Sequence, residues 1–448
     1  MIAHARLLHD YEAGIGVPGS PIDPAPDPGS NLAATLPVWD LAAGSVAALT
    51  AAANRHRQAN RLAPVPHRID PMRINAAFRS DQLLRVDGRQ VPMFGDLSGF
   101  FPTFDGWVRT HANYPHHRVR LLAALGLPPE APLDLAVAML AMTRAADIEE
   151  NAAAVGAVAV RVRTEDEWAV EPQAQAAAAG PLVAIEPRAD RAAPRYRSDP
   201  TPFQPLRGVR VLDLTRVIAG PVATRSLALL GAEVLRIDPP QLPEIPWQFL
   251  DTGQGKRSTL LDLRAEWAVF DELLSTADVL VTGYRPGALE QAGLNTQVRP
   301  GLVHARISAW GESGPWGERR GFDSIVQAAT GIAITEGAPS VPGALPAQAL
   351  DHASGYLLAA GIIDALVARV FDGIGRDVRV SLARTASWLL TAPDRTPSHP
   401  NPALPSPAAA VYRDNTITAA PALAEYPDYL WAAPEYGGDE AAWPVYSR

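Results

Sequence analysis

The chain has no cysteine, and Lys256 is the single lysine among its 448 residues. Without cysteine the protein cannot form disulfides, thiolate nucleophiles, zinc–thiolate sites or iron–sulfur clusters. Such a composition is typical of a reducing compartment, so we expect a cytoplasmic protein. No uninterrupted apolar run approaches about 18 residues, and the first ten residues (MIAHARLLHD) lack the apolar segment of a signal peptide. We therefore expect neither a membrane span nor secretion.

Basic residues are also too few for a nucleic-acid-binding protein. The 39 Lys and Arg residues face 48 Asp and Glu residues, which gives a net charge of −9. Because phosphate neutralisation needs a basic surface, we expect no nucleic-acid partner. We expect no metal either, since His67, His304 and His352 have no spacing to carboxylates that defines a metal site. An anionic ligand must be held by a local group of cations.

Proline is abundant, with 43 residues, and 15 of them lie in three runs. Proline fixes φ and removes a backbone donor, so the runs at 17–29, 193–206 and 392–407 predict extended linkers. The middle run is the best domain boundary. At about 150 residues per domain, the length allows two or three domains.

Short apolar strands alternate with helices after this boundary. The strands are expected at 209–214, 233–238, 278–283 and 302–308, and 221–230 has helical periodicity. This alternation predicts an α/β fold with a doubly wound parallel sheet. Ligands of such sheets bind at the carboxyl ends of the strands, so we expect the site there.

Two stretches of the chain resemble each other. The motif DLAAG at residue 40 and the motif DHASG at residue 351 both precede an apolar helix, and residues 72–84 align without gaps on 378–390. The sequence thus predicts a partial internal repeat in which Asp40 corresponds to Asp351.

Two glycine-containing loops are candidates for anion binding. Residues 215–221 (TRVIAGP) join a strand to a helix, where Gly220 and the free N–H groups of the helix start favour an anion. Residues 253–258 (GQGKRS) present Lys256 and Arg257, but the first glycine and the final Ser or Thr of a Walker A motif are missing. A structural turn and a solvated basic loop are the respective alternatives.

Three further side chains stand at expected strand or helix ends. Arg285 follows the strand at 278–283 and can pair with a phosphate, while Trp310 follows the strand at 302–308 and can stack on a base. An exposed turn arginine and a core tryptophan are the ordinary alternatives. Asp351 opens an apolar helix, where it is either an N-cap or, in a site that excludes water, a nucleophile.

Six ordered blocks between residues 206 and about 390 resemble the class III coenzyme A-transferase family, the CaiB/BaiF type. The blocks are 206–240 (LRGVRVLDLTRVIAGPVATRSLALLGAEVLRIDPP), 255–264 (GKRSTLLDLR), 277–294 (ADVLVTGYRPGALEQAGL), 299–315 (RPGLVHARISAWGESGP), 319–331 (RRGFDSIVQAATG) and 349–369 (ALDHASGYLLAAGIIDALVAR). The resemblance implies a large α/β domain that binds coenzyme A (CoA), a smaller α+β domain, and an interlocked homodimer. It also implies acyl-CoA and a small carboxylic acid as substrates, without a permanently bound cofactor.

The resemblance implies the residue roles as well. Asp351 matches the family's catalytic aspartate, which forms an acyl-aspartyl anhydride and then an aspartyl–CoA thioester before an acceptor acid takes the CoA. The expected CoA contacts are Val217, Ala219, Gly220, Arg236, Lys256, Arg257, Arg285 and Arg306, together with Trp310 as the candidate for base stacking. As the one lysine of an arginine-rich chain, Lys256 is expected near the CoA phosphates.

The order of the segments differs from that of the family, because stretches that resemble its small domain come first. We expect a partial repeat of the large domain at 1–85, a small domain at 86–192, a linker at 193–206, the large domain at 207–395 and a tail at 396–448.

Two other functions stay open. α-Methylacyl-CoA racemases of the same superfamily carry a histidine before the aspartate of a G-H-D block. Here the block is Gly321-Phe322-Asp323, and phenylalanine cannot act as an acid or base, which favours transfer. A catalytically silent CoA-binding protein is the other alternative, given the segment order and Ala309 where glycine is common.

Overall fold

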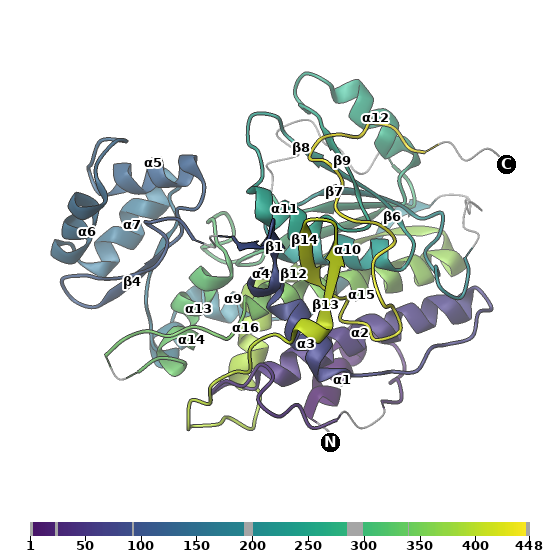
Figure 1. Cartoon of the computed structure of the whole chain (residues 1–448), viewed down its shortest axis with the longest axis horizontal. Coiled ribbons are helices and arrows are strands. Elements are labelled where there is room, and N and C mark those ends of the chain that lie inside the picture. Colours follow the sequence, from purple (N-terminus) through teal and green to yellow (C-terminus); the bar gives the residue numbers. More distant parts are fainter. Residues whose placement is uncertain are drawn as a thin grey trace.

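A seven-stranded sheet forms the centre of the fold (Figure 1). The structure is a computed structural model, and it describes residues 3–22, 26–91, 94–191, 200–284, 299–338 and 340–444. The strands are β6 (Ala184–Arg191), β7 (Arg210–Leu214), β8 (Glu233–Asp238), β9 (Arg257–Leu260), β10 (Val279–Thr282), β11 (Val303–Ser308) and β12 (Ile374–Ser381). Their order is β6-β12-β11-β10-β7-β8-β9, with every pair from β12 to β9 parallel and β6 antiparallel at the edge. The predicted doubly wound parallel sheet is confirmed.

The strand order reverses next to β7. The chain adds β8 and β9 on one side of β7 and then returns to place β10, β11 and β12 on the other side. Such a reversal leaves a crevice at the carboxyl ends of β7 and β10.

One long helix crosses the core beside this sheet. The helices after β7 are α10 (Ala219–Leu229), α11 (Pro246–Thr252), α12 (Trp267–Thr276), α13 (Asp323–Thr330), α14 (Ile332–Thr335), α15 (Ala349–Asp372) and α16 (Leu382–Thr391). Every residue of α15 from Ala349 to Leu366 is buried. Gly355 lets α10 pack closely, because a Cβ there would lie 2.6 Å from the carbonyl oxygen of Ala219.

Among the described residues, α15 is also the one helix that is long and apolar enough to cross a membrane. Its mean hydropathy reaches 1.5 over an 18-residue window, although polar residues such as Asp351 and Asp364 interrupt the apolar run. Of that window 72% is buried inside the fold, as in a core helix.

The N-terminal helices pack onto α15. They are α1 (Ala3–Ile15), α2 (Val38–Ala59), α3 (Pro71–Phe78) and α4 (Ser80–Leu83), and α2 lies against α15. The helices α2 and α15 start alike, since their N-cap residues have φ/ψ of −75°/62° and −74°/62° and Asp40 and Asp351 are the third residue of each. In the second half of the proposed repeat, residues 72–75 are helical where the aligned residues 378–381 end a strand, whereas 76–83 are largely helical like the aligned residues 382–389. The repeat stays a prediction.

A small unit, residues 94–161, lies to one side of the main sheet (Figure 1). Its strands β3 (Phe100–Pro102), β4 (Trp107–Thr110) and β5 (Ala159–Arg161) pack with α5 (Pro115–Ala124), α6 (Leu133–Met142) and α7 (Ala145–Val155) around a hydrophobic core of their own. Two short helices, α8 (Glu165–Ala169) and α9 (Pro172–Ala178), then lead back to the main sheet. There β6 pairs with β12, so the structure assigns residues 184–191, expected in the small domain, to the main sheet.

The C-terminal tail docks on the rest of the chain. Its strands β13 (Ala410–Arg413) and β14 (Thr416–Ala419), preceded by a 3-10 turn at Pro407–Ala409, form a sheet with β1 (Arg85–Val86) and β2 (Arg89–Gln90). Further along, Asp439 accepts the backbone N–H of Ser258 at 2.8 Å, and the Trp443 indole donates to the carbonyl of Leu273 at 3.1 Å. The aromatic and acidic end of the tail therefore covers the β9 edge of the sheet.

A buried charge cluster joins the N-terminal helices to α15. The Arg55 guanidinium contacts Asp364 at 2.7 and 2.8 Å and Glu12 at 2.7 Å, and the Tyr11 hydroxyl donates to Asp364 at 2.5 Å. Both carboxylates are nearly fully buried. Arg55 is therefore the cation that compensates both.

We expect Arg55→Ala to lower the free energy of unfolding by about 3 kcal/mol, because it leaves two buried carboxylates without their cation. Chemical denaturation measures the change. The control is Arg144→Ala, which removes the exposed partner of Asp105 and should cost less than about 1 kcal/mol. Equal losses in the two variants would contradict the role given to the cluster.

Candidate functional site

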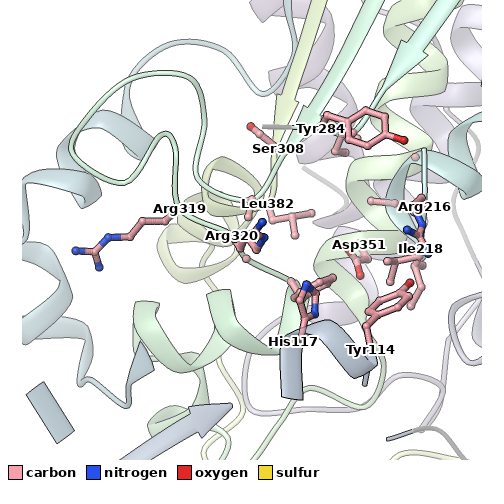
Figure 2. A pocket seen from close by; sticks show the side chains of 18 of the residues that line it. Tyr114, His117, Arg216, Ile218, Tyr284, Ser308, Arg319, Arg320, Asp351 and Leu382 are labelled. Atoms are coloured by element: carbon pink, nitrogen blue, oxygen red, sulfur yellow. The ribbon is translucent and has the colours of Figure 1, made fainter. Parts of the chain in front are cut away.

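A cavity of about 310 Å³ lies at the carboxyl ends of β7, β10 and β11, where the main sheet meets the small unit (Figure 2). The main sheet contributes the loop 214–220 after β7, residues 283–284 after β10 and residues 307–309 after β11. The small unit contributes Tyr114, His116 and His117, while residues 317 and 319–322, Asp351 and Leu382 complete the lining. The cavity occupies the crevice that the reversal of strand order predicts.

Asp351 projects into this cavity from the first turn of α15. Its residue is buried, and its carboxylate has no hydrogen-bond partner among the described residues. The helix N-cap is Gln348, without a side-chain cap. The alternative in which Asp351 caps its own helix is therefore wrong: the aspartate stands inside the helix, and its side chain is free for chemistry.

A second buried carboxyl, Asp323, holds the start of α15. It accepts the backbone N–H of Asp351 at 3.0 Å and is bound on its other oxygen by the Gln327 amide. Burial raises the pKa of Asp323 to about 6, against the stabilising effect of these hydrogen bonds. Burial, and after it the charge of Asp323, raises the pKa of Asp351 well above its usual range. The carboxylate of Asp351 is therefore more basic than an ordinary aspartate.

The loop after β7 is held in a strained conformation. Val217 has φ of 70°, which is unusual for a β-branched residue, and its N–H donates to the buried carboxylate of Glu244 at 2.9 Å. A Cβ on Gly220 would lie 2.3 Å from Cβ of Thr215, so only glycine fits there. Val217, Ala219 and Gly220 all line the cavity, as expected of CoA contacts.

The structure gives Lys256 a different place from the expected one. The side chain is buried, and Nζ donates to Asp213 at 3.0 Å and to the carbonyl of Pro221 at 2.9 Å. Asp213 also accepts hydrogen bonds from Thr215 and Thr224. Burial lowers the pKa of Lys256 to about 8, although Asp213 opposes this. The lysine thus ties the first turn of α10 to the end of β7 and does not face a phosphate site.

The other expected CoA contacts that the structure describes also lie outside the cavity lining. Arg236 is fully buried between Asp238 and Glu244, and Arg257 pairs with Asp439 under the C-terminal tail. Arg306 pairs with Glu312 at 2.6 Å. Trp310 is a core side chain, in edge contact with Trp316 at 4.8 Å between ring centroids, rather than a stacking surface. Arg285 falls outside the described residues.

Residues that the sequence analysis missed supply the polar part of the cavity. They are Tyr114, His116, His117, Arg216, Tyr284, Ser308, Arg319 and Arg320. Figure 2 shows Tyr114, His117, Ile218 and Arg320 around Asp351, whereas the Arg319 side chain extends away. The adjacent histidines of the sequence PHH and the adjacent arginines of RRG were the available signals, but neither predicts contact with Asp351.

Charged and titratable side chains share the lining of the cavity. Arg216 and Arg320 bring two guanidiniums beside the carboxyl of Asp351, and Glu244 lies 3.6 Å from Arg216. Burial, and then the neighbouring His116 and His111, lowers the pKa of His117 to about 2, so its imidazole is neutral at physiological pH. The ring of Phe322 stacks on His111 with 3.7 Å between centroids, and His111 and His117 lie 6.1 Å apart in edge contact. In the parts of the chain that the structure describes, no group of three or more His, Asp or Glu residues could hold a metal.

Comparison with known proteins finds a family that resembles the C-terminal half of the chain. Residues 206–407 match the profile of CoA-transferase family III. A probable fatty acyl-CoA transferase of Mycobacterium tuberculosis is 36% identical over 211 residues, which cover 42% of this chain and 53% of that protein. The acetyl-CoA:oxalate CoA-transferase of Acetobacter aceti is 33% identical over 203 residues, 40% of this chain and 51% of that one. Over the matched segment, the chain is similar to the class III CoA-transferase family.

Solved structures also match part of the chain. A crystal structure of a hypothetical protein from Mycobacterium tuberculosis is 35% identical with a TM-score of 0.39 and covers 43% of this chain and 58% of that one. A CAIB/BAIF family protein from Brucella suis is 27% identical with a TM-score of 0.39, covering 42% and 56%. The chain spans about half the length of the curated relatives it matches.

The raised pKa of Asp351 predicts a pH-dependent stability. A carboxyl whose pKa is higher in the folded than in the unfolded protein (about 3.9) destabilises the fold as the pH rises through that interval. We therefore expect Asp351→Asn to gain stability relative to wild type between pH 4 and pH 8, as measured by chemical denaturation at both values. Asp271→Asn, at an exposed position of α12, should follow wild type. A constant difference between Asp351→Asn and wild type at the two pH values would contradict the raised pKa.

Proposed function

We propose that the protein transfers coenzyme A from an acyl-CoA thioester to a carboxylic acid, with Asp351 as the group that carries first the acyl moiety and then the CoA. The observation that carries the proposal is the position of Asp351: a basic, unpartnered carboxyl at the carboxyl end of the sheet, in a cavity lined by arginines. The names of the matched relatives support the same reaction class.

The proposed reaction begins when an oxygen of Asp351 attacks the thioester carbonyl carbon. The carbon–sulfur bond breaks, the CoA thiolate leaves, and an acyl-aspartyl anhydride forms. The thiolate then attacks Cγ of Asp351 and releases the donor acid, which leaves an aspartyl–CoA thioester. The acceptor carboxylate repeats these steps in reverse. Burial of Asp351 favours the attack, because a poorly hydrated carboxylate with a raised pKa is a better nucleophile.

The arginines of the cavity would serve the anionic partners of this reaction. Arg216 lies 5.0 Å over the Tyr114 ring and 3.6 Å from Glu244, and Arg320 donates to the carbonyl of Gly156 at 2.8 Å. Both guanidiniums are held at the cavity wall, where they can attract a carboxylate or a thiolate. We also propose that the protein is a homodimer and that it is cytoplasmic, as the sequence predicts.

We expect Asp351→Asn to reduce acyl-CoA:carboxylate transfer at least about a thousandfold, because the covalent carrier is lost. In the wild type, incubation with acyl-CoA and hydroxylamine or borohydride should modify Asp351, as mapped by peptide mass spectrometry. The matched control is Asp40→Asn, the same position of helix α2, which should stay within about twofold of wild type. Transfer that survives in Asp351→Asn would refute the proposal.

One observation favours a second candidate, an α-methylacyl-CoA racemase. The small unit brings the imidazoles of His116 and His117 into the cavity that contains Asp351, although Phe322 occupies the position where the racemases carry histidine. Two groups that move a proton at the α-carbon would exchange it with solvent.

We expect no deuterium at the α-carbon of a 2-methylacyl-CoA incubated with the enzyme in heavy water. The neutral His117, with a pKa near 2, is too weak a base for this proton. Mass spectrometry of the recovered thioester measures the uptake. Rapid exchange, lost in Asp351→Asn, would replace the transferase proposal with the racemase one.

A further inference from the structure

A second, smaller cavity adjoins Asp351. Its volume is about 20 Å³, and Val217, Ile218, Phe322 and Asp351 line it as well as the larger cavity. These four residues therefore lie between the two spaces. Asp351 is thus accessible from the substrate cavity and from a separate chamber, which we call the rear chamber.

The rear chamber has the size and the polarity of a water site. A buried water needs about 10–15 Å³ of accessible volume and two to four polar partners. The chamber is too small for a carboxylic acid or a pantetheine arm. Its polar lining consists of Asp81, His111, Asn113, Gln248, Ser324, Gln348 and Asp351.

Two polar atoms of this lining need a partner that the described residues do not provide. Nδ1 of His111 and Oγ of Ser324 are buried without a hydrogen bond. Burial, and after it the charge of Arg109, lowers the pKa of His111 to about 3, so the ring is neutral near pH 7. One nitrogen of a neutral imidazole donates a hydrogen bond and the other accepts one. Buried polar groups without a protein partner are commonly satisfied by ordered water.

Asp81 adds a base to the chamber. It lies in α4, where Oδ1 accepts the N–H of Gln82 at 2.9 Å. Burial, and after it the buried carboxylate of Asp251, raises the pKa of Asp81 to about 7. Near neutral pH this carboxylate can therefore both accept and release a proton. The proposed transfer reaction does not use it.

We propose that the rear chamber holds a water molecule that hydrolyses the aspartyl–CoA thioester on Asp351, with Asp81 as general base, so that the protein is also an acyl-CoA hydrolase. The water oxygen bonds to Cγ of Asp351 and the Cγ–S bond breaks. One water proton passes through Asp81 to the CoA thiolate, and the other stays on the regenerated Asp351 carboxyl. Because Asp351 must first carry CoA, this proposal rests on the proposed function.

Hydrolysis is tested by omitting the acceptor acid. Wild-type enzyme with acyl-CoA alone should release free CoA over many turnovers, followed with a thiol reagent. Asp81→Asn should lower this release roughly 100-fold, the usual contribution of a general base, while CoA transfer to an added acceptor continues. Ser324→Val, which fills the chamber without removing a charge, should also lower the release, and the exposed Asp96→Asn should not.

Oxygen-18 water locates the attacked atom. In a single turnover with enzyme in excess, the peptide that contains Asp351 should gain one oxygen-18 and the released acid none. Label in the released acid would show direct attack on the acyl carbon and overturn the proposal. Equal CoA release by Asp81→Asn and wild type would overturn it too, as would transfer without any acceptor-free release. If the wild type shows neither CoA transfer nor CoA release, the proposed function itself is refuted.

Discussion

The hydrogen bond from the backbone of Asp351 to the carboxylate of Asp323 is the interaction on which the site depends. The N-cap residue of helix α15 makes no side-chain hydrogen bond. Instead, Asp323 of α13 accepts a backbone N–H from the first turn of α15. The side chain of Asp351 is therefore not consumed by helix capping. The same interaction places two carboxyls in one buried region, and burial together with their mutual repulsion makes Asp351 basic. The hydrogen bond that fixes the start of α15 thus also leaves the Asp351 carboxylate available for the proposed reaction.

Buried ion pairs that do not line the cavity hold the residues around Asp351 and Asp323 in place. Asp213 and Glu244 are buried carboxylates on either side of the loop after β7, and they are compensated by Lys256 and Arg236. Breaking such a pair leaves an uncompensated charge in the interior. Glu244 also accepts the N–H of Val217, whose strained backbone lines both cavities. The shape of the site therefore depends on cations that touch no substrate.

The sequence predicted β7, β8, β10 and β11, because these strands are short apolar runs with polar or glycine boundaries, and Glu233–Asp238 was placed at its observed bounds. It did not predict β6, β9 or β12. The family resemblance also pointed to Asp351, Val217 and Gly220, and the structure brings these residues together in the lining of one cavity. The sequence could not predict that Lys256 is buried, since its partner Asp213 lies 43 residues away and a basic residue after glycines looks the same in a phosphate loop. Nor could it place His117 in the cavity, because packing of the small unit on the main sheet brings it there.

The central claim is that the larger cavity delivers a CoA thioester to Asp351. A crystal structure of the protein with CoA tests it most directly. The account predicts the CoA sulfur about 3–4 Å from the Asp351 carboxyl, with the pantetheine arm between the loop 214–220 and Tyr114. A CoA molecule bound elsewhere, with its thiol remote from Asp351 and the cavity empty, would contradict it.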